Sequence, residues 1–423
     1  MSAALPRRLA ATSAGPVPRV VGPADVILTA AVIALVAFGV VMVFSASAVR
    51  ADQAFGDPAH YLVRQAIFAL VGVFTMLFVA RIDYHRYRPL TYPVLGVSVF
   101  LMLVVAFGFG RSAGGAARWI ALGPINIQPA EAATLALVLW LAYSLSKKAE
   151  RIKSFEVGFL PHALMAGFLM LLCLKQPDFG SAVMIGLLTF TLLFAAGARL
   201  GYLLGAVLLA APVAYLLIAT SPYRMRRIRA FLAPFEHRMN EGYQVFESLI
   251  SFGAGGVTGV GIGDGRQKLF FLPEAHTDFI GAIVAEELGF VGTFLLIAIF
   301  AVVVARGFRV AYRAADDYGS YLAVGISTFL GHQAFTNLAV AMGMLPTKGL
   351  VLPFISYGGS SLLVNCAACG LLLNVSRPRE GALDEDAAHD DARTSRRSRP
   401  RRGAAARRRP PSRQALRVGG RHG

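Results

Sequence analysis

Residues 26–47 have the sequence VILTAAVIALVAFGVVMVFSAS, which contains no charged side chain. At about 1.5 Å per residue, a helix of this length matches the roughly 30 Å hydrocarbon core of a bilayer. Arg7, Arg8 and Arg19 precede this stretch, as basic residues precede the apolar part of a signal peptide. The apolar stretch is too long for a signal peptide and lacks a convincing cleavage site. We therefore expect a retained first transmembrane helix.

The rest of the chain has the same apolar character. Of its 423 residues, 56% are hydrophobic and 15% are charged, whereas a soluble protein carries roughly 25% charged residues. Because each spanning segment must satisfy its own backbone hydrogen bonds, we predict an all-α polytopic integral membrane protein with about ten transmembrane helices. The expected helices lie near residues 26–48, 62–80, 90–110, 127–145, 157–174, 180–197, 200–219, 279–305, 320–343 and 357–375.

Basic residues predict the orientation of these helices. With a cytoplasmic N-terminal segment (residues 1–24), alternate short loops carry most of the basic charge, and both termini of the membrane domain (residues 25–376) are cytoplasmic. The tail, residues 377–423, contains 14 Arg and 6 acidic residues, so its composition predicts disorder. We expect the tail to lie near anionic lipids rather than to bind nucleic acid, because no aromatic residues alternate with its arginines. The basic residues expected on the inner side are Arg81, Arg86, Arg88, Lys147, Lys148, Arg151, Lys153, Arg199, Arg306, Arg309 and Arg313.

One long segment, residues 220–275, is expected on the outer side although it is basic. Long loops follow the charge rule poorly, and long loops in compact proteins are usually functional. Arg224 and Arg226 in this loop suit a phosphate-bearing lipid substrate, and binding of ordinary lipid headgroups is an equally open interpretation. The glycine-rich stretch Gly253–Gly265 follows no strand, so we reject a dinucleotide site and expect close backbone packing instead.

An acidic segment, LPEAHTD at residues 272–278, follows the long loop. Pro273 suits the first position of a helix, which would place Glu274 and Asp278 on one face near the positive end of the helix dipole. Asp278 there could act as a general base or hold a divalent cation, or it could simply cap the helix. Glu286 and Glu287 are expected deeper in the same helix, where a carboxylate needs a partner.

Several polar groups interrupt the apolar sequence at other helix ends expected on the same side. Each is weak evidence by itself, but together they predict one outward-facing site. The three cysteines, Cys173, Cys366 and Cys369, are expected to be packing residues. The polar candidates are Arg118, Gln128, Glu131, Lys175, Gln176, Asp178, Lys348, Ser356 and Ser360.

Seven motifs give the chain a specific resemblance to the SEDS family (shape, elongation, division and sporulation), over about residues 22–376. The segment MLPTKGL, residues 344–350, is similar to the division-type members. The motifs are SAS (45–47), GPINIQPAE (123–131), QPDFG (176–180), YRMRR (223–227), LPEAHTDF (272–279), EELG (286–289) and ISYGGSS (355–361).

The resemblance implies a peptidoglycan glycosyltransferase that polymerises lipid II on the outer face of the bacterial cytoplasmic membrane, at the division septum. It implies that Asp278 is the general base and that Mg²⁺ or Mn²⁺ assists, held by Asp278 or by the substrate pyrophosphate. Its implied partners are a class B penicillin-binding transpeptidase, other divisome proteins and membrane lipids. The implied substrate-binding residues are Arg118, Glu131, Lys175, Gln176, Asp178, Arg224, Arg226, Glu274, Lys348, Ser356 and Ser360.

The chain departs from the family pattern in one region. The family commonly has Gln-Pro-Ser-Glu-x-x-Lys, where this chain has Ala130 and Thr134 in place of the Ser and the Lys, and Ala117 replaces a second arginine. We hypothesise that Lys175 supplies the missing cation. A lipid II flippase and a catalytically weakened scaffold that recruits the transpeptidase are the alternative functions.

Overall fold

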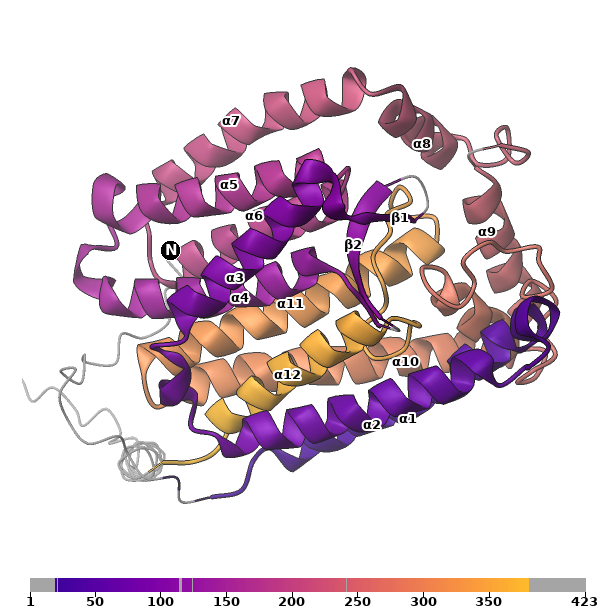
Figure 1. Cartoon of the computed structure of the whole chain (residues 1–423), viewed down its shortest axis with the longest axis horizontal. Coiled ribbons are helices and arrows are strands. Elements are labelled where there is room, and N and C mark those ends of the chain that lie inside the picture. The colour runs from indigo at the N-terminus through magenta and orange to yellow at the C-terminus, as the bar shows by residue number, and fades with distance from the viewer. Residues whose placement is uncertain (1–19, 21, 114–115, 124, 241, 380–423) are drawn as a thin grey trace, which may run out of the picture. The chain divides into compact units, whose positions relative to one another are not determined.

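The computed structural model describes residues 20, 22–113, 116–123, 125–240 and 242–379. Helices dominate this part of the chain, in the order and approximate positions expected from the sequence (Figure 1). Ten longer helices form a bundle, and most of them end within a few residues of the predicted boundaries. The helices are α1 (Val26–Phe55), α2 (His60–Arg81), α3 (Thr91–Val104), α4 (Pro129–Lys147), α5 (Leu160–Lys175), α6 (Phe179–Ala195), α7 (Leu200–Ala219), α8 (Pro222–Leu232), α9 (Tyr243–Gly255), α10 (Ile280–Arg313), α11 (Asp317–Ala341) and α12 (Gly359–Val375).

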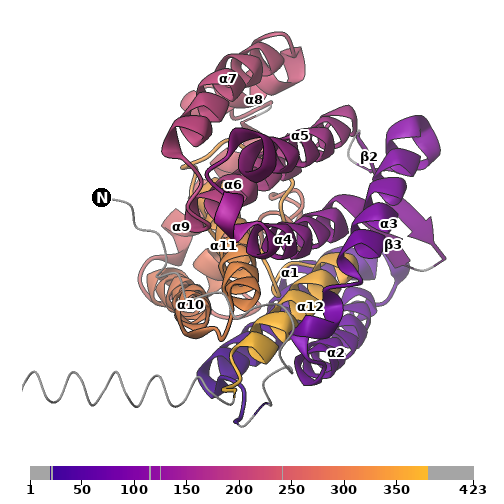
Figure 2. The ribbon, with the colours of Figure 1, turned by 90° about the vertical axis from the view of Figure 1, so that its left-hand side faces the viewer.

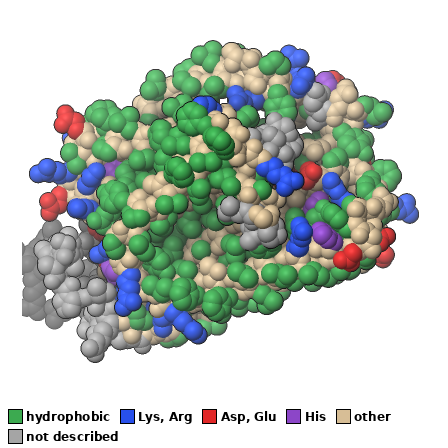
Figure 3. Space-filling model, in the orientation of Figure 1, with side chains coloured by type: hydrophobic (Ala, Val, Ile, Leu, Met, Phe, Trp, Pro, Cys, Tyr) green, Lys and Arg blue, Asp and Glu red, His purple; other side chains and the backbone are tan. Residues whose placement is uncertain are grey.

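Within the described residues, seven helices are long and apolar enough to cross a membrane. These are α1, α2, α3 with its extension to Phe109, α4, α5 with the turn before it, α7 and α10. α6 and α12 are shorter apolar helices. Hydrophobic side chains cover most of the visible surface between the ends of the bundle, and Lys and Arg gather mainly toward the ends (Figure 3). The structure therefore supports a multi-pass membrane protein.

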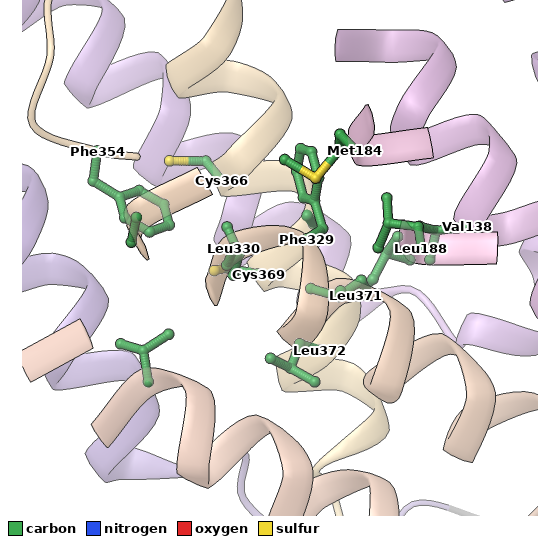
Figure 4. Close-up of a cluster of buried hydrophobic side chains, with 14 of the residues drawn as sticks. Val138, Met184, Leu188, Phe329, Leu330, Phe354, Cys366, Cys369, Leu371 and Leu372 are labelled. Atoms are coloured by element: carbon green, nitrogen blue, oxygen red, sulfur yellow. The ribbon is translucent and has the colours of Figure 1, made fainter. Parts of the chain in front are cut away.

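The core lies where α11 and α12 meet α4 and α6. Phe329 and Leu330 of α11 and Cys369 of α12 lie in this layer (Figure 4), whereas the Cys366 sulfur lies against Gly72 of α2. Both cysteines are buried and unbonded, which agrees with a packing role. One turn beyond Cys366, Gly370 lies so close to α2 that a Cβ atom on it would be 2.6 Å from the carbonyl oxygen of Met76. Small residues on α12 thus allow close helix packing.

A small sheet and two short helices were absent from the prediction. The hairpin region, residues 111–127, forms a three-stranded antiparallel sheet of β1 (Arg111–Ala113), β2 (Ala116–Leu122) and β3 (Ile125–Ile127). The long loop contains the helices α8 and α9, and with the sheet and the start of α12 they lie near one end of the bundle (Figures 1 and 2). The sheet also shows that a strictly all-α description was too narrow.

The acidic segment does not begin a helix, so that part of the prediction was wrong. α10 begins at Ile280, with Phe279 as its N-cap residue, and residues 273–279 form turns. Glu274 has a φ of 55°, in the left-handed region that a regular helix excludes. Asp278 therefore lies just before the helix, and the spacing argument for one helical face does not apply to it.

The glycine-rich stretch packs against α10, as predicted. α10 breaks at Gly289, which has φ 65° and ψ −160°, and the free carbonyls of Glu286 and Glu287 accept hydrogen bonds from the backbone N–H groups of Val260 and Gly261. Gly259 has a φ of 83°, and a Cβ on it would be 2.1 Å from the carbonyl oxygen of Glu287. Only glycine permits this approach.

Both buried acids of α10 have partners, as the sequence predicted. Glu287 accepts hydrogen bonds from the Ser45 hydroxyl on α1 (2.6 Å) and from the Lys268 ammonium (2.6 Å). Glu286 accepts from the backbone N–H of Arg266 (2.8 Å). The SAS and EELG segments thus bind the long loop to the bundle.

Candidate functional site

A cavity of about 720 Å³ opens at the end of the bundle that carries the sheet. Six parts of the chain supply its charged side chains: α2, the sheet, the start of α4, α8, and the two loops that precede α10 and α12. Together these groups can bind an anionic substrate next to a carboxylate. The charged lining residues are Arg64, Arg111, Arg118, Glu131, Arg227, Glu274, Asp278 and Lys348.

Asp278, which lies in the loop before α10, has a strongly raised pKa. Removal from water raises the pKa of its carboxyl group, and the negative charge of Glu274 raises it further. The guanidinium groups of Arg227 and Arg118 lower it, and the result is a pKa of about 7. A group with this pKa can accept a proton at neutral pH and release it again.

The neighbouring acids differ from Asp278 in their surroundings. Glu274 is exposed and accepts a hydrogen bond from the Thr277 hydroxyl (2.8 Å). Glu131 is buried at the start of α4, and its Oε2 atom has no hydrogen-bond partner among the described residues. Ser360, at the start of α12, lies beside Glu131. The wall of the cavity therefore contains one buried carboxylate oxygen without a hydrogen-bond partner among the described residues.

The basic side chains of the cavity differ in their hydrogen-bond partners among the described residues. Arg118 donates hydrogen bonds to the carbonyl oxygens of Gln176 and Pro177. Arg227 donates to the carbonyl oxygen of Thr347 (3.0 Å). The Lys348 ammonium makes no hydrogen bond or ion pair with the part of the chain that the structure describes, and burial lowers its pKa. Lys348 is thus a cation of the cavity that can pair with an anionic ligand.

Several predicted residues lie outside the cavity lining. The Lys175 ammonium lies 4.4 Å from the centre of the Phe107 ring, and Arg224 donates to the carbonyl oxygen of Leu217. Lys348, unlike Lys175, lines the cavity whose wall contains the position of the missing family lysine. Thr134 occupies that position in the cavity wall, and its hydroxyl donates to the carbonyl oxygen of Ala130.

Three further predicted residues support the cavity walls from behind. Asp178 caps α6 by accepting from the backbone N–H of Ser181 (3.1 Å). The Gln176 amide donates to the carbonyl oxygen of Met102 (2.8 Å). Ser356 donates to the carbonyl oxygen of Thr277 (2.6 Å). Arg226 is also absent from the lining.

Two lining cations, Arg64 and Arg111, were missed as site residues. Arg64 interrupts the apolar sequence of α2, and a charge inside such a helix is itself a signal of function. Arg111 lies in β1, a strand that the sequence analysis did not predict. Arg227 belongs to the YRMRR motif, in which the sequence offered no means of choosing among the arginines.

The chain resembles known proteins along nearly its whole membrane domain. A model of the cell cycle protein family that includes FtsW, RodA and SpoVE matches residues 25–381. The chain belongs to this family. The resemblance seen in the sequence is therefore confirmed.

Several relatives and solved structures are similar to this chain over most of its length. The chain is 49% identical to the probable peptidoglycan glycosyltransferase FtsW of Geobacter metallireducens, over 84% of this chain and 96% of that protein. It is 42% identical to stage V sporulation protein E of Bacillus subtilis, over 84% and 97%. A chain from a peptidoglycan synthase complex that coordinates polymerization and crosslinking superposes with a TM-score of 0.70, at 31% identity over 85% of this chain and 99% of that one. RodA of Thermus thermophilus gives 0.63, at 29% identity over 84% and 98%.

Proposed function

We propose that this chain is a peptidoglycan glycosyltransferase that polymerises lipid II into glycan strands, with Asp278 as the general base. The observation that supports this most directly is the convergence of Asp278 and several cations on one cavity. The names of its family relatives point to the same activity. The proposed location is the cytoplasmic membrane at the division septum.

The proposed reaction has one bond-forming and one bond-breaking event. Asp278 accepts the proton of the acceptor sugar hydroxyl, and that oxygen forms a bond to the anomeric carbon of the donor. The bond between that carbon and the pyrophosphate oxygen breaks, and polyprenyl pyrophosphate leaves. Arg118, Arg227 and Lys348 line the cavity where they can stabilise the developing negative charge.

A divalent cation would fit this site only together with the substrate. Among the described residues, no three His, Cys, Asp or Glu side chains could hold a metal ion together. Mg²⁺ is commonly bound by one or two carboxylates and by substrate phosphates. The substrate pyrophosphate oxygens would provide most of such a set, with one carboxylate oxygen of Asp278 beside them. Mg²⁺ or Mn²⁺ held there would supply positive charge near the leaving pyrophosphate.

We also propose that the cavity faces outward, with about ten helices crossing the membrane and both ends of the membrane domain in the cytoplasm. The end of the bundle predicted to face the cytoplasm is tied by ionic contacts. His85 lies between Asp83 (2.7 Å) and Asp316 (2.6 Å), and Arg379 binds Asp83 (2.6 Å). Arg306 forms an ion pair with Asp25 at the start of α1.

These contacts favour polymerisation over transport. A flippase that alternates its access must open the cytoplasmic end, and opening would break a network that joins the ends of α1, α2, α10, α11 and α12. Each of these pairs has at least one partly exposed side chain, so breaking it costs on the order of 1 kcal/mol or less, but opening would break several of them together. A polymerase needs no such opening.

The proposed partner is a class B penicillin-binding transpeptidase, with other divisome proteins and membrane lipids. The similar chain from a complex that couples polymerization to crosslinking supports this assignment. The test of the proposal uses purified protein in detergent micelles, with and without the transpeptidase, given lipid II and Mg²⁺ or Mn²⁺. Long glycan strands in micelles support a polymerase, because micelles have no second compartment to receive a transported lipid. No strands with any partner or metal would refute it.

A further inference from the structure

The segment that carries Asp278 is held by neighbouring segments instead of by a helix of its own. Three consecutive backbone carbonyl groups, those of residues 276–278, each accept a hydrogen bond from elsewhere in the chain. The Tyr357 N–H donates to the first (2.9 Å), the Ser356 hydroxyl to the second (2.6 Å) and the Asn337 amide to the third (2.9 Å). The position of Asp278 therefore depends on these donors.

Among these donors, the Asn337 side chain also holds a second segment. It lies on α11, is 2% exposed, and uses its Nδ2 atom twice: toward the carbonyl oxygen of Asp278 (2.9 Å) and toward that of Leu350 (2.7 Å). Because both acceptors are carbonyl oxygens, the amide must present its nitrogen to them, and the flipped orientation would set oxygen against oxygen. The two N–H groups of one amide thus connect two loops.

The second loop contains Lys348 and passes close to the carboxylate of Asp278. A Cβ atom on Gly349 would be 3.6 Å from Asp278 Oδ2 and 3.4 Å from Arg118 Nη1. Because Gly349 has no side chain, its backbone can lie close to both Asp278 and Arg118. The next residue is Leu350, whose carbonyl oxygen accepts the hydrogen bond from Asn337.

We infer that Asn337 is a positioning residue that fixes the Asp278 carboxylate relative to the loop of Lys348 and Gly349. This inference rests on the proposed function, because it gives Asn337 an effect only through the base. Without the amide, two buried carbonyl groups lose their donor, and the two loops lose their shared anchor. A shift of about 1 Å at a catalytic group can lower the rate roughly 100-fold.

The test compares Asn337→Ala with Asn365→Ala in full-length protein given lipid II. Asn365 is a matched control, because it is a buried asparagine that donates to Ser361 one turn away in the same helix, α12 (3.3 Å). We expect Asn337→Ala to lower kcat by about 10- to 100-fold with little change in KM, and Asn365→Ala to stay close to the wild-type value. If Asn337→Ala does not fold, as judged by thermal unfolding, Asn337→Ser takes its place with the same readout.

A double-mutant comparison separates positioning from general loss of structure. In an Asp278→Asn background, measured by single turnover, Asn337→Ala should cause no further loss, because there is no base left to position. An equal loss in both backgrounds would overturn the inference, as would a wild-type kcat for Asn337→Ala and Asn337→Ser. Wild-type activity of Asp278→Asn alone would instead refute the proposed base.

Discussion

The pH dependence of polymerisation should follow the ionisation of Asp278, and Glu274 should shift it. With a pKa of about 7, roughly one tenth of the protein carries an ionised Asp278 at pH 6 and roughly nine tenths at pH 8. Because the base must be ionised, activity is present above the pKa and is lost as the pH falls through it. We expect the rate at pH 6 to be about tenfold lower than the rate at pH 8.

The substitution Glu274→Gln removes one cause of the raised pKa. Glu274 is exposed, and its Oε2 atom accepts from the Thr277 hydroxyl, a role that the amide oxygen of glutamine can keep. A like charge near a carboxyl group disfavours its ionised form and raises its pKa, so removing the charge of Glu274 should lower the pKa of Asp278. We therefore expect the loss of activity to occur at lower pH in Glu274→Gln than in the wild type, so that the rate at pH 6 rises above roughly one tenth of its maximum.

The assay measures initial rates of strand formation from lipid II across this pH range, with substrate above KM. Asp264→Asn is the control, because Asp264 is an exposed acid of the long loop that does not line the cavity. Its profile should match that of the wild type. A wild-type rate that does not change with pH would refute this electrostatic account. So would a loss of activity that occurs at higher pH in Glu274→Gln than in the wild type.

Three further substitutions test other parts of the structure. Lys268→Ala leaves Glu287 buried without its cation, so the free energy of unfolding should fall by about 3–5 kcal/mol, which thermal unfolding measures; an unchanged Tm would contradict the buried pair. Gly259→Ala sets a Cβ against the Glu287 carbonyl at a positive φ, so the same assay should show a clear loss of stability, and wild-type stability would disprove the close contact. Lys348→Gln should lower kcat/KM about tenfold or more, given about 1.5–3 kcal/mol for a charged hydrogen bond, and a larger loss for Lys175→Gln would contradict the cavity assignment.

Much of the bundle could be predicted, because membrane helices leave a strong signal in composition. Long apolar stretches located the helices within a few residues, and an acid such as Glu287 in the middle of one indicated a buried partner. The glycines near Gly259 indicated close backbone contact. Each of these features depends on residues within one short stretch of sequence, so the sequence alone can indicate it.

The candidate site was predicted less completely, because it depends on contacts between distant segments. Pro273 and the spacing of Glu274 and Asp278 suited a helix, but hydrogen bonds from α11 and the loop before α12 hold this segment as turns. The sheet was missed because its strands are short and have no clear alternation. The family pattern drew attention to the lysine missing at Thr134, whereas the structure shows Lys348 lining the same cavity.

The central claim is that the Asp278 carboxylate acts as the base in glycosyl transfer. The most direct measurement is single-turnover polymerisation of lipid II by wild-type protein and Asp278→Ala, with the transpeptidase partner and a divalent cation present. Loss of a general base predicts a rate about 10²–10⁴-fold lower, with folding and lipid II binding retained. Glycan strands from Asp278→Ala at the wild-type rate would contradict the account.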